Sequence, residues 1–226
     1  SSESKTNGFT DNHGFNDNWS TSGFLLFRQR LGKPGRTISA NVRYSFSNNS
    51  LDGENQSLTR IEDKDEQPVV VNQRIDQTSK SSSLSGRIVY TEPLGHDLFL
   101  EANYQYSWNR NISDKLAYNS GNIEDPIPQD ATHLKYISDG EEKDETYSNE
   151  ILNRSASQRA GVNLSYQKEK FRAQIGASIN PTETRNVTNG VDTTFTVYNW
   201  SPQAMLNYEF NDNSHIRFFY FGRSAQ

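Results

Sequence analysis

The sequence predicts an all-β fold, an antiparallel up-and-down meander of about eight strands that forms part of a transmembrane β-barrel. Three observations predict it. Apolar and polar residues alternate with a period of two along the whole chain, and helical i, i+3, i+4 patterning is hard to find. The connections between these segments are alternately short and long, as in a barrel with short turns at one end. Aromatic residues gather at the ends of the apolar tracks, as they do at membrane interfaces.

The composition fits a protein without a large aliphatic core. Of the 226 residues only 32% are hydrophobic, yet 12% are aromatic, including 11 Tyr and 12 Phe. This is too few apolar residues for an ordinary globular domain and too many aromatic residues for a disordered chain. The net charge of -5 gives no basic footprint for a nucleic acid, and the absence of cysteine excludes disulfides and thiolate metal sites. No apolar run approaches the roughly 18 residues of a membrane helix, which excludes a helical membrane protein.

The first half of the predicted barrel contains two pairs of strands. Residues 23–31 and 37–48 flank the turn GKPG, where Pro34 followed by Gly35 suits a type II turn. The second of these strands carries Ile38, Ala40 and Val42 on one face. Residues 83–91 and 97–109 then flank the short connection EPLGHD.

The second half repeats this arrangement. Residues 158–167 and 171–180 flank QKEK, and residues 194–210 and 215–223 flank NDNS. The long connections are predicted at 49–82, 111–157 and 181–193, all at the opposite end of the sheet. We therefore expect a polar lead-in segment at residues 1–22 and a partial barrel at residues 23–226.

Aromatic side chains on the apolar tracks predict two membrane girdles around an aliphatic band. Eight to ten tilted strand residues rise roughly 20 to 25 Å, which matches an apolar band about 25 Å tall. An amphipathic ring suits that depth because its polar atom reaches the headgroups. The girdle candidates are Tyr44, Phe46, Tyr90, Tyr104, Trp108, Tyr166, Phe171, Trp200, Tyr208 and Phe210.

The opposite face of each strand is polar and predicts a wet lumen. A charge in the middle of a strand must face water or a partner. These charges either contact a plug or a solute or, as we favour, neutralise one another inside the barrel. The lumen-facing candidates are Arg43, Glu101, Arg159, Arg172, Glu209 and Arg217.

Several segments resemble the outer-membrane β-barrel family related to TonB-dependent receptors of Bacteroidetes. They are GRTISANVRYSFS, GRIVYTEPLGHDLFLEANYQYSW and NYEFNDNSHIRFFYFGRSAQ, of which YTEPLG and YFGRSAQ are the most specific. The resemblance covers nearly all of the chain, weakly in the long connections and the first 22 residues. It implies a large barrel in the outer membrane, preceded by a plug domain, and a role in solute uptake or binding.

The resemblance also suggests which partners to expect. No plug domain or TonB-box-like segment can be identified, and no terminal aromatic residue closes the chain, so we expect about eight strands of a larger barrel. The expected partners are outer-membrane lipid, the remaining strands and plug domain, TonB-type energy coupling through that plug, and an unknown solute. No nucleic acid is expected.

No catalytic, cofactor or metal site is predicted, and we expect no enzyme activity. The acidic stretch at 137–150 lacks the spacing of a calcium loop, the four histidines are scattered, and no hydrolase or phosphate-loop motif occurs. The alternative to a barrel is a soluble β-sandwich that binds carbohydrate or serves in adhesion. Residues 111–157 argue against it, because they contain only Tyr118, Tyr136 and Tyr147 as aromatic platforms.

Overall fold

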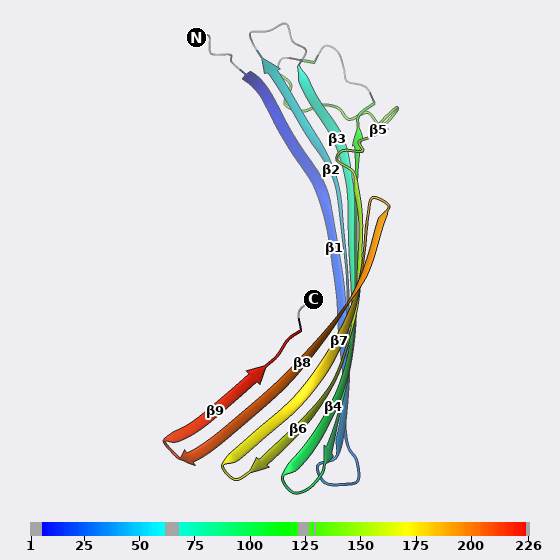
Figure 1. Ribbon diagram of the computed structural model, residues 1–226. Coiled ribbons are helices and arrows are strands. Elements are labelled where there is room, and N and C mark those ends of the chain that lie inside the picture. Colours follow the sequence, from blue (N-terminus) through cyan, green and yellow to red (C-terminus); the bar gives the residue numbers. More distant parts are fainter. Residues whose placement is uncertain (1–5, 62–67, 122–126, 129, 225–226) are drawn as a thin grey trace.

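The fold is a single long, curved β-sheet (Figure 1). The computed structural model describes residues 6–61, 68–121, 127–128 and 130–224. Within these residues no helix is long and apolar enough to cross a membrane. The strands are β1 (Thr6–Arg30), β2 (Thr37–Ile61), β3 (Val69–Pro93), β4 (Leu98–Asn119), β5 (Glu142–Lys143), β6 (Asn149–Lys168), β7 (Phe171–Thr188), β8 (Val191–Asn211) and β9 (Ser214–Phe221).

The strand order confirms the predicted meander. The sheet runs β1-β2-β3-β4-β6-β7-β8-β9, every pairing is antiparallel, and the two-residue β5 pairs with the end of β4. All strands in the described part of the chain belong to this one sheet, so a two-sheet sandwich is not formed there. Among the described residues, β1 pairs only with β2 and β9 only with β8, which leaves two sheet edges open.

The short turns lie together at one end of the sheet, at the bottom of Figure 1. They join β1 to β2, β3 to β4, β6 to β7, and β8 to β9. In the first of them Gly32 and Gly35 have φ values of 51° and 85°, a left-handed conformation that glycine adopts at little cost. The short-turn end was correctly predicted from the turn residues.

The strands are much longer than the sequence suggested, and the predicted long connections are largely wrong. Residues 49–61 continue β2, 69–82 lie in β3, and 111–119 and 149–157 extend β4 and β6. Residues 181–193 form the ends of β7 and β8 around a two-residue turn at Asn189 and Gly190, with φ values of 48° and 83°. The described part of the predicted lead-in, residues 6–22, belongs to β1, whereas residues 62–67 lie outside the described residues.

The cause is that alternation marks only the part of a strand with one apolar face. β2 has 25 residues, which at about 3.4 Å each and a tilt of about 40° rise roughly 65 Å, against an apolar band about 25 Å tall. Beyond the band both faces are polar, so the hydrophobic signal ends while backbone pairing continues. Polar cross-strand pairs line that extension, such as Ser81 to Asn111 at 2.7 Å.

Candidate functional site: the two faces of the sheet

The register assigns each strand residue to one of two faces, because successive side chains point to opposite sides of a sheet. Next to the short turns one face is apolar, and we call this region the apolar band. No charged residue interrupts the band between its ends on the described strands. Its large aliphatic and phenyl side chains are exposed, for example Leu25 at 70% and Ile175 at 61%. Others are Phe27, Val42, Leu84, Ile88, Val162, Ile179, Leu206, Ile216 and Phe218.

All ten girdle candidates lie on the face of the apolar band. Toward the short turns, Phe171 lies between Tyr166 and Tyr208, with ring centroids 5.9 and 6.4 Å apart, and Phe210 contacts Tyr208 at 4.8 Å. Toward the other end, Phe46 packs on Trp19 with 5.1 Å between ring centroids. Trp19 escaped the sequence analysis because it lies in the supposed lead-in, although it is in phase with Leu25 and Phe27. The role of these rings at the headgroups stays a prediction.

The six lumen-facing candidates all lie on the opposite face, which we call the polar face. Sequence reasoning missed Arg87, although it alternates with Ile88, and also Arg28, Arg30 and Lys115 on the same face. At the level of the apolar band this face carries seven arginines and two glutamates. It therefore has an excess of five positive charges in a chain whose formal net charge is -5.

The expected mutual neutralisation of these charges is not formed within the described residues. None of the ion pairs there includes Arg43, Arg87, Arg159, Arg172 or Arg217. The reason is placement, since the cross-strand partners of these arginines are serine, asparagine, glutamine and, for Arg43, also Phe24, and none is a carboxylate. Two arginines lie over aromatic rings instead, Arg43 at 5.4 Å from the Phe24 centroid and Arg217 at 5.9 Å from that of Phe219.

Acidic side chains are sorted by face along most of the length of the long strands. On the polar face of these strands the carboxylates are Glu101 and Glu209, both close to the short turns. At the far end, Glu142 of β5 pairs with Asn119 and Asp144 accepts bonds from Gln73 and Asn119, which brings two further carboxylates to the polar face. Beyond the apolar band, the acidic residues of the long strands lie on the other face. They are Asp11, Asp17, Asp52, Glu54, Asp76, Asp114, Glu150, Glu183 and Asp192. Between that far end and the level of the short turns, the polar face of the described long strands therefore carries no carboxylate.

A hollow of about 740 Å³ opens on the polar face between β6 and β9. The chain after β9 follows β8, held by bonds from the Gly222 amide to the Pro202 carbonyl (2.9 Å) and from the Ser224 amide to the Trp200 carbonyl (3.1 Å). Arg223 therefore borders the hollow on its β9 side, and Arg159 borders it on its β6 side. The polar-face residues that line the hollow between them are Asn180, Val197, Asn199, Ser201, Gln203 and Phe221.

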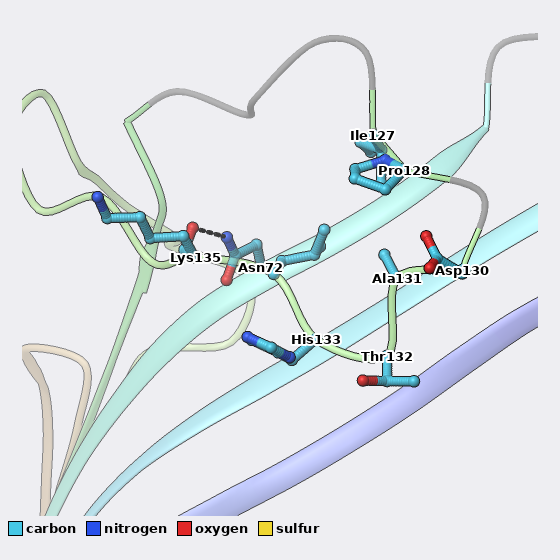
Figure 2. A pocket seen from close by; sticks show the side chains of 9 residues that line it. Asn72, Ile127, Pro128, Asp130, Ala131, Thr132, His133 and Lys135 are labelled. Atoms are coloured by element: carbon cyan, nitrogen blue, oxygen red, sulfur yellow. Dashed lines mark hydrogen bonds between the residues drawn. The ribbon is translucent and has the colours of Figure 1, made fainter.

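Residues 127–128 and 130–148, which we call the cap, fold against the ends of β2, β3 and β4. The Gln56 side chain is fully buried there and bonds both backbone groups of Leu134, donating to its carbonyl at 2.6 Å and accepting from its amide at 2.9 Å. Asn72 donates to the Lys135 carbonyl at 3.0 Å (Figure 2). The pocket between cap and sheet in Figure 2 has a volume of about 360 Å³.

The acidic stretch of the cap is used for internal contacts. Glu141 pairs with Arg74 at 2.9 Å and accepts a hydrogen bond from the Tyr136 hydroxyl. These bonds lower the pKa of Glu141, with Arg74 as the main cause, while burial and the bond to Glu141 raise the pKa of Tyr136 to about 12. Asp144 accepts bonds from Gln73 and Thr146. In the described residues no three His, Asp or Glu side chains are arranged to hold a metal ion.

The YTEPLG segment carries an ion pair at the short-turn end, beyond the apolar band. Glu92 accepts two hydrogen bonds from Arg36, at 2.7 and 2.8 Å, and lies 3.5 Å from the Lys33 ammonium. The bonds from Arg36 and from the Tyr90 hydroxyl hold the pKa of Glu92 at about 2. The β1–β2 turn is thereby attached to the end of β3.

Comparison with known proteins gives one family. The model of a family described as "Outer membrane protein beta-barrel family" matches residues 29–226. No curated protein matches the chain.

Proposed function

The chain belongs to the outer membrane protein β-barrel family and forms barrel wall in the outer membrane; from this premise we propose that it serves a TonB-dependent-receptor-like protein in solute uptake or binding. Lipid surrounds such a wall. The apolar band supplies the surface for it, because side chains such as Leu25 and Ile175 are mostly exposed and would be costly to leave in water. The proposal assigns no catalytic role to any residue.

The polar face carries the proposal. Its arginines are exposed and have no carboxylate partners among the described residues. A barrel of only eight strands has an interior that side chains fill, and burying unpaired charges there costs several kcal/mol per ion. Water around the arginines therefore requires a wider barrel.

The two open edges of the sheet support the same proposal. Backbone groups that face hydrocarbon without a hydrogen-bond partner cost several kcal/mol each, so a spanning sheet closes on itself. We propose that further strands pair with β1 and β9 and that a plug domain occupies part of the lumen. We propose energy coupling through that plug because YTEPLG and YFGRSAQ resemble an outer-membrane barrel family related to TonB-dependent receptors.

Uptake into intact cells tests the proposal. Cells with and without the full-length protein are given a panel of neutral, anionic and cationic fluorescent solutes, before and after a protonophore collapses the proton-motive force. Protein-dependent uptake that the protonophore abolishes supports a TonB-dependent receptor. Protein-dependent uptake that persists indicates a passive channel and removes the energy-coupling part. No protein-dependent uptake or binding of any solute contradicts a role in solute uptake.

A further inference from the structure

We infer that the polar face is an anion-attracting path, and that the hollow between β6 and β9 binds an organic solute bearing carboxylate, sulfate or phosphate groups. This inference rests on the proposed function and names the chemical class of its solute. It depends on three features of the polar face: the sorting of charge, the availability of the arginines, and the side chains of the hollow.

Over most of the strands' length the sorting of charge leaves an anion a route without carboxylates. Beyond the apolar band the polar face of β1 to β8 carries mainly serine, threonine, asparagine and glutamine, with some apolar residues such as Ile75 and Phe195, and Lys115 is its charged residue on the long strands. The acidic residues of the long strands in this extension lie on the other face, and Glu142 and Asp144 reach the polar face only at the ends of β3 and β4. Positive charge then begins at the level of the apolar band, where low-dielectric walls around water focus the field of charged residues.

The polar-face arginines at the level of the apolar band have N–H donors available to bind an anion. A guanidinium has five N–H donors in a planar fork that matches carboxylate, sulfate and phosphate oxygens. Arg87 and Arg159 lie in one row across the sheet, both paired with Gln105 of β4, so their backbones are about 10 Å apart. Neither belongs to an ion pair of the described residues, and both are exposed.

The hollow adds the contacts that an organic anion needs beyond charge. Arg159 and Arg223 border it on two sides. Asn180 and Asn199 are cross-strand partners and present amides to it, and Phe221 is 72% exposed, which gives an apolar surface for the carbon skeleton. Gln203 reaches across β7 to donate to Asn163 at 3.1 Å, because Gly176 between them has no side chain. That bond fixes the floor of the hollow.

A cysteine placed in the hollow tests the inference on the full-length protein in outer-membrane vesicles. Asn199→Cys is suitable because this chain has no cysteine of its own. The rates of modification by the anionic methanethiosulfonate ethylsulfonate and the cationic methanethiosulfonate ethyltrimethylammonium report the local potential. We expect the anionic reagent to be favoured relative to its rate with free thiol, and 8-methoxypyrene-1,3,6-trisulfonate, but not raffinose, to slow modification.

The expected effect of neutralising the two arginines follows from their charge. At about 10 Å in water-like surroundings each charge changes the local concentration of a monovalent ion roughly twofold. Arg159→Gln with Arg223→Gln acts in opposite directions on the two reagents and changes each rate about fourfold, so the anionic-to-cationic rate ratio should fall about 16-fold. The matched control, Lys80→Gln with Arg110→Gln, removes equal charge from the other face and should leave the ratio unchanged.

Three results would overturn the inference: no preference for the anionic reagent, an equal fall in the control, or equal protection by raffinose and the trisulfonate. No preference for the anionic reagent is also the result expected if these arginines form ion pairs with an acidic segment of another domain, because their positive charge would then be neutralised. Protein-dependent uptake of neutral solutes without anionic preference rejects the inference and leaves the proposed function standing. Anionic preference without protein-dependent uptake rejects the proposed function and leaves the binding site.

Discussion

Ile88→Arg tests the assignment of the two faces, and Val89→Arg is its matched control. Both are β-branched residues of β3, adjacent in sequence, on opposite faces of the sheet. Ile88 lies in the apolar band between Ala40 and Tyr104, with 49% of its surface exposed. Val89 lies on the polar face between Ser39 and Asn103.

The depth of Ile88 sets the magnitude. On β3 the band covers roughly residues 82–91, and each residue rises about 2.6 Å along the membrane normal at a tilt of about 40°. Ile88 is then about 4 Å from the middle of the band. An arginine on the lipid face costs about 2 to 4 kcal/mol at the midplane and about 0 to 1 near the interfaces. We therefore expect a loss of about 2 to 3 kcal/mol for Ile88→Arg and close to none for Val89→Arg.

The assay is reversible folding of the full-length protein into lipid vesicles along a urea titration. Folded protein is separated by its shifted electrophoretic mobility without heating, and the free energy of unfolding comes from the linear extrapolation. Equal losses in the two variants, or a larger loss for Val89→Arg, would refute the assignment of the faces. So would full stability of Ile88→Arg.

Two further predictions concern the ends of the sheet. Gln56→Ala removes two hydrogen bonds and leaves the amide and carbonyl of Leu134 unsatisfied. We expect this to destabilise the closed cap by about 2 kcal/mol, which should appear as faster hydrogen exchange of the Leu134 amide. Gln174→Ala on the polar face should not change that exchange, and equal exchange in both variants would contradict the role of Gln56. At the short turns, the carboxyl of Glu92 should titrate near pH 2 by carbon NMR and move toward 4.5 in Arg36→Gln. Because the folded pKa is the lower one, the ion pair stabilises the turn fully above pH 4.5 and is lost as pH falls through 2; an unchanged titration in Arg36→Gln would exclude Arg36 as the cause.

The alternation of side chains carried most of the fold prediction. A residue's face depends only on whether its position is odd or even, so Val42 and Arg43 were assigned to opposite faces without any knowledge of strand ends. Turn residues such as Pro34 and Gly35 then located the short-turn end. These are local properties, and a single sequence contains them.

The far ends of the strands were not predictable from hydrophobicity. Residues 49–61 have no apolar face, and their pairing depends on the neighbouring strand rather than on their own pattern. The exception is the turn between β7 and β8. Asn-Gly is the strongest short signal for a two-residue hairpin, and Asn189 and Gly190 have the positive φ values that such a turn requires. This Asn-Gly signal was present in the sequence and correctly predicts a hairpin in place of the long connection at 181–193.

The error in strand length also concealed the sorting of charge. Asp52 and Glu54 have the same parity as Val42, so the rule that assigned Val42 to the apolar face also assigns these carboxylates to that face. This parity rule applies only if residues 49–61 continue the strand. If these residues formed a loop, the rule would not say on which face Asp52 and Glu54 lie. Once the strands are extended, parity places the acidic residues of the extension on the other face, so the carboxylates that share the band level of the polar face with its arginines are Glu101 and Glu209. Both the strand length and this sorting have one physical cause: backbone pairing, rather than hydrophobicity, continues the β-structure beyond the membrane.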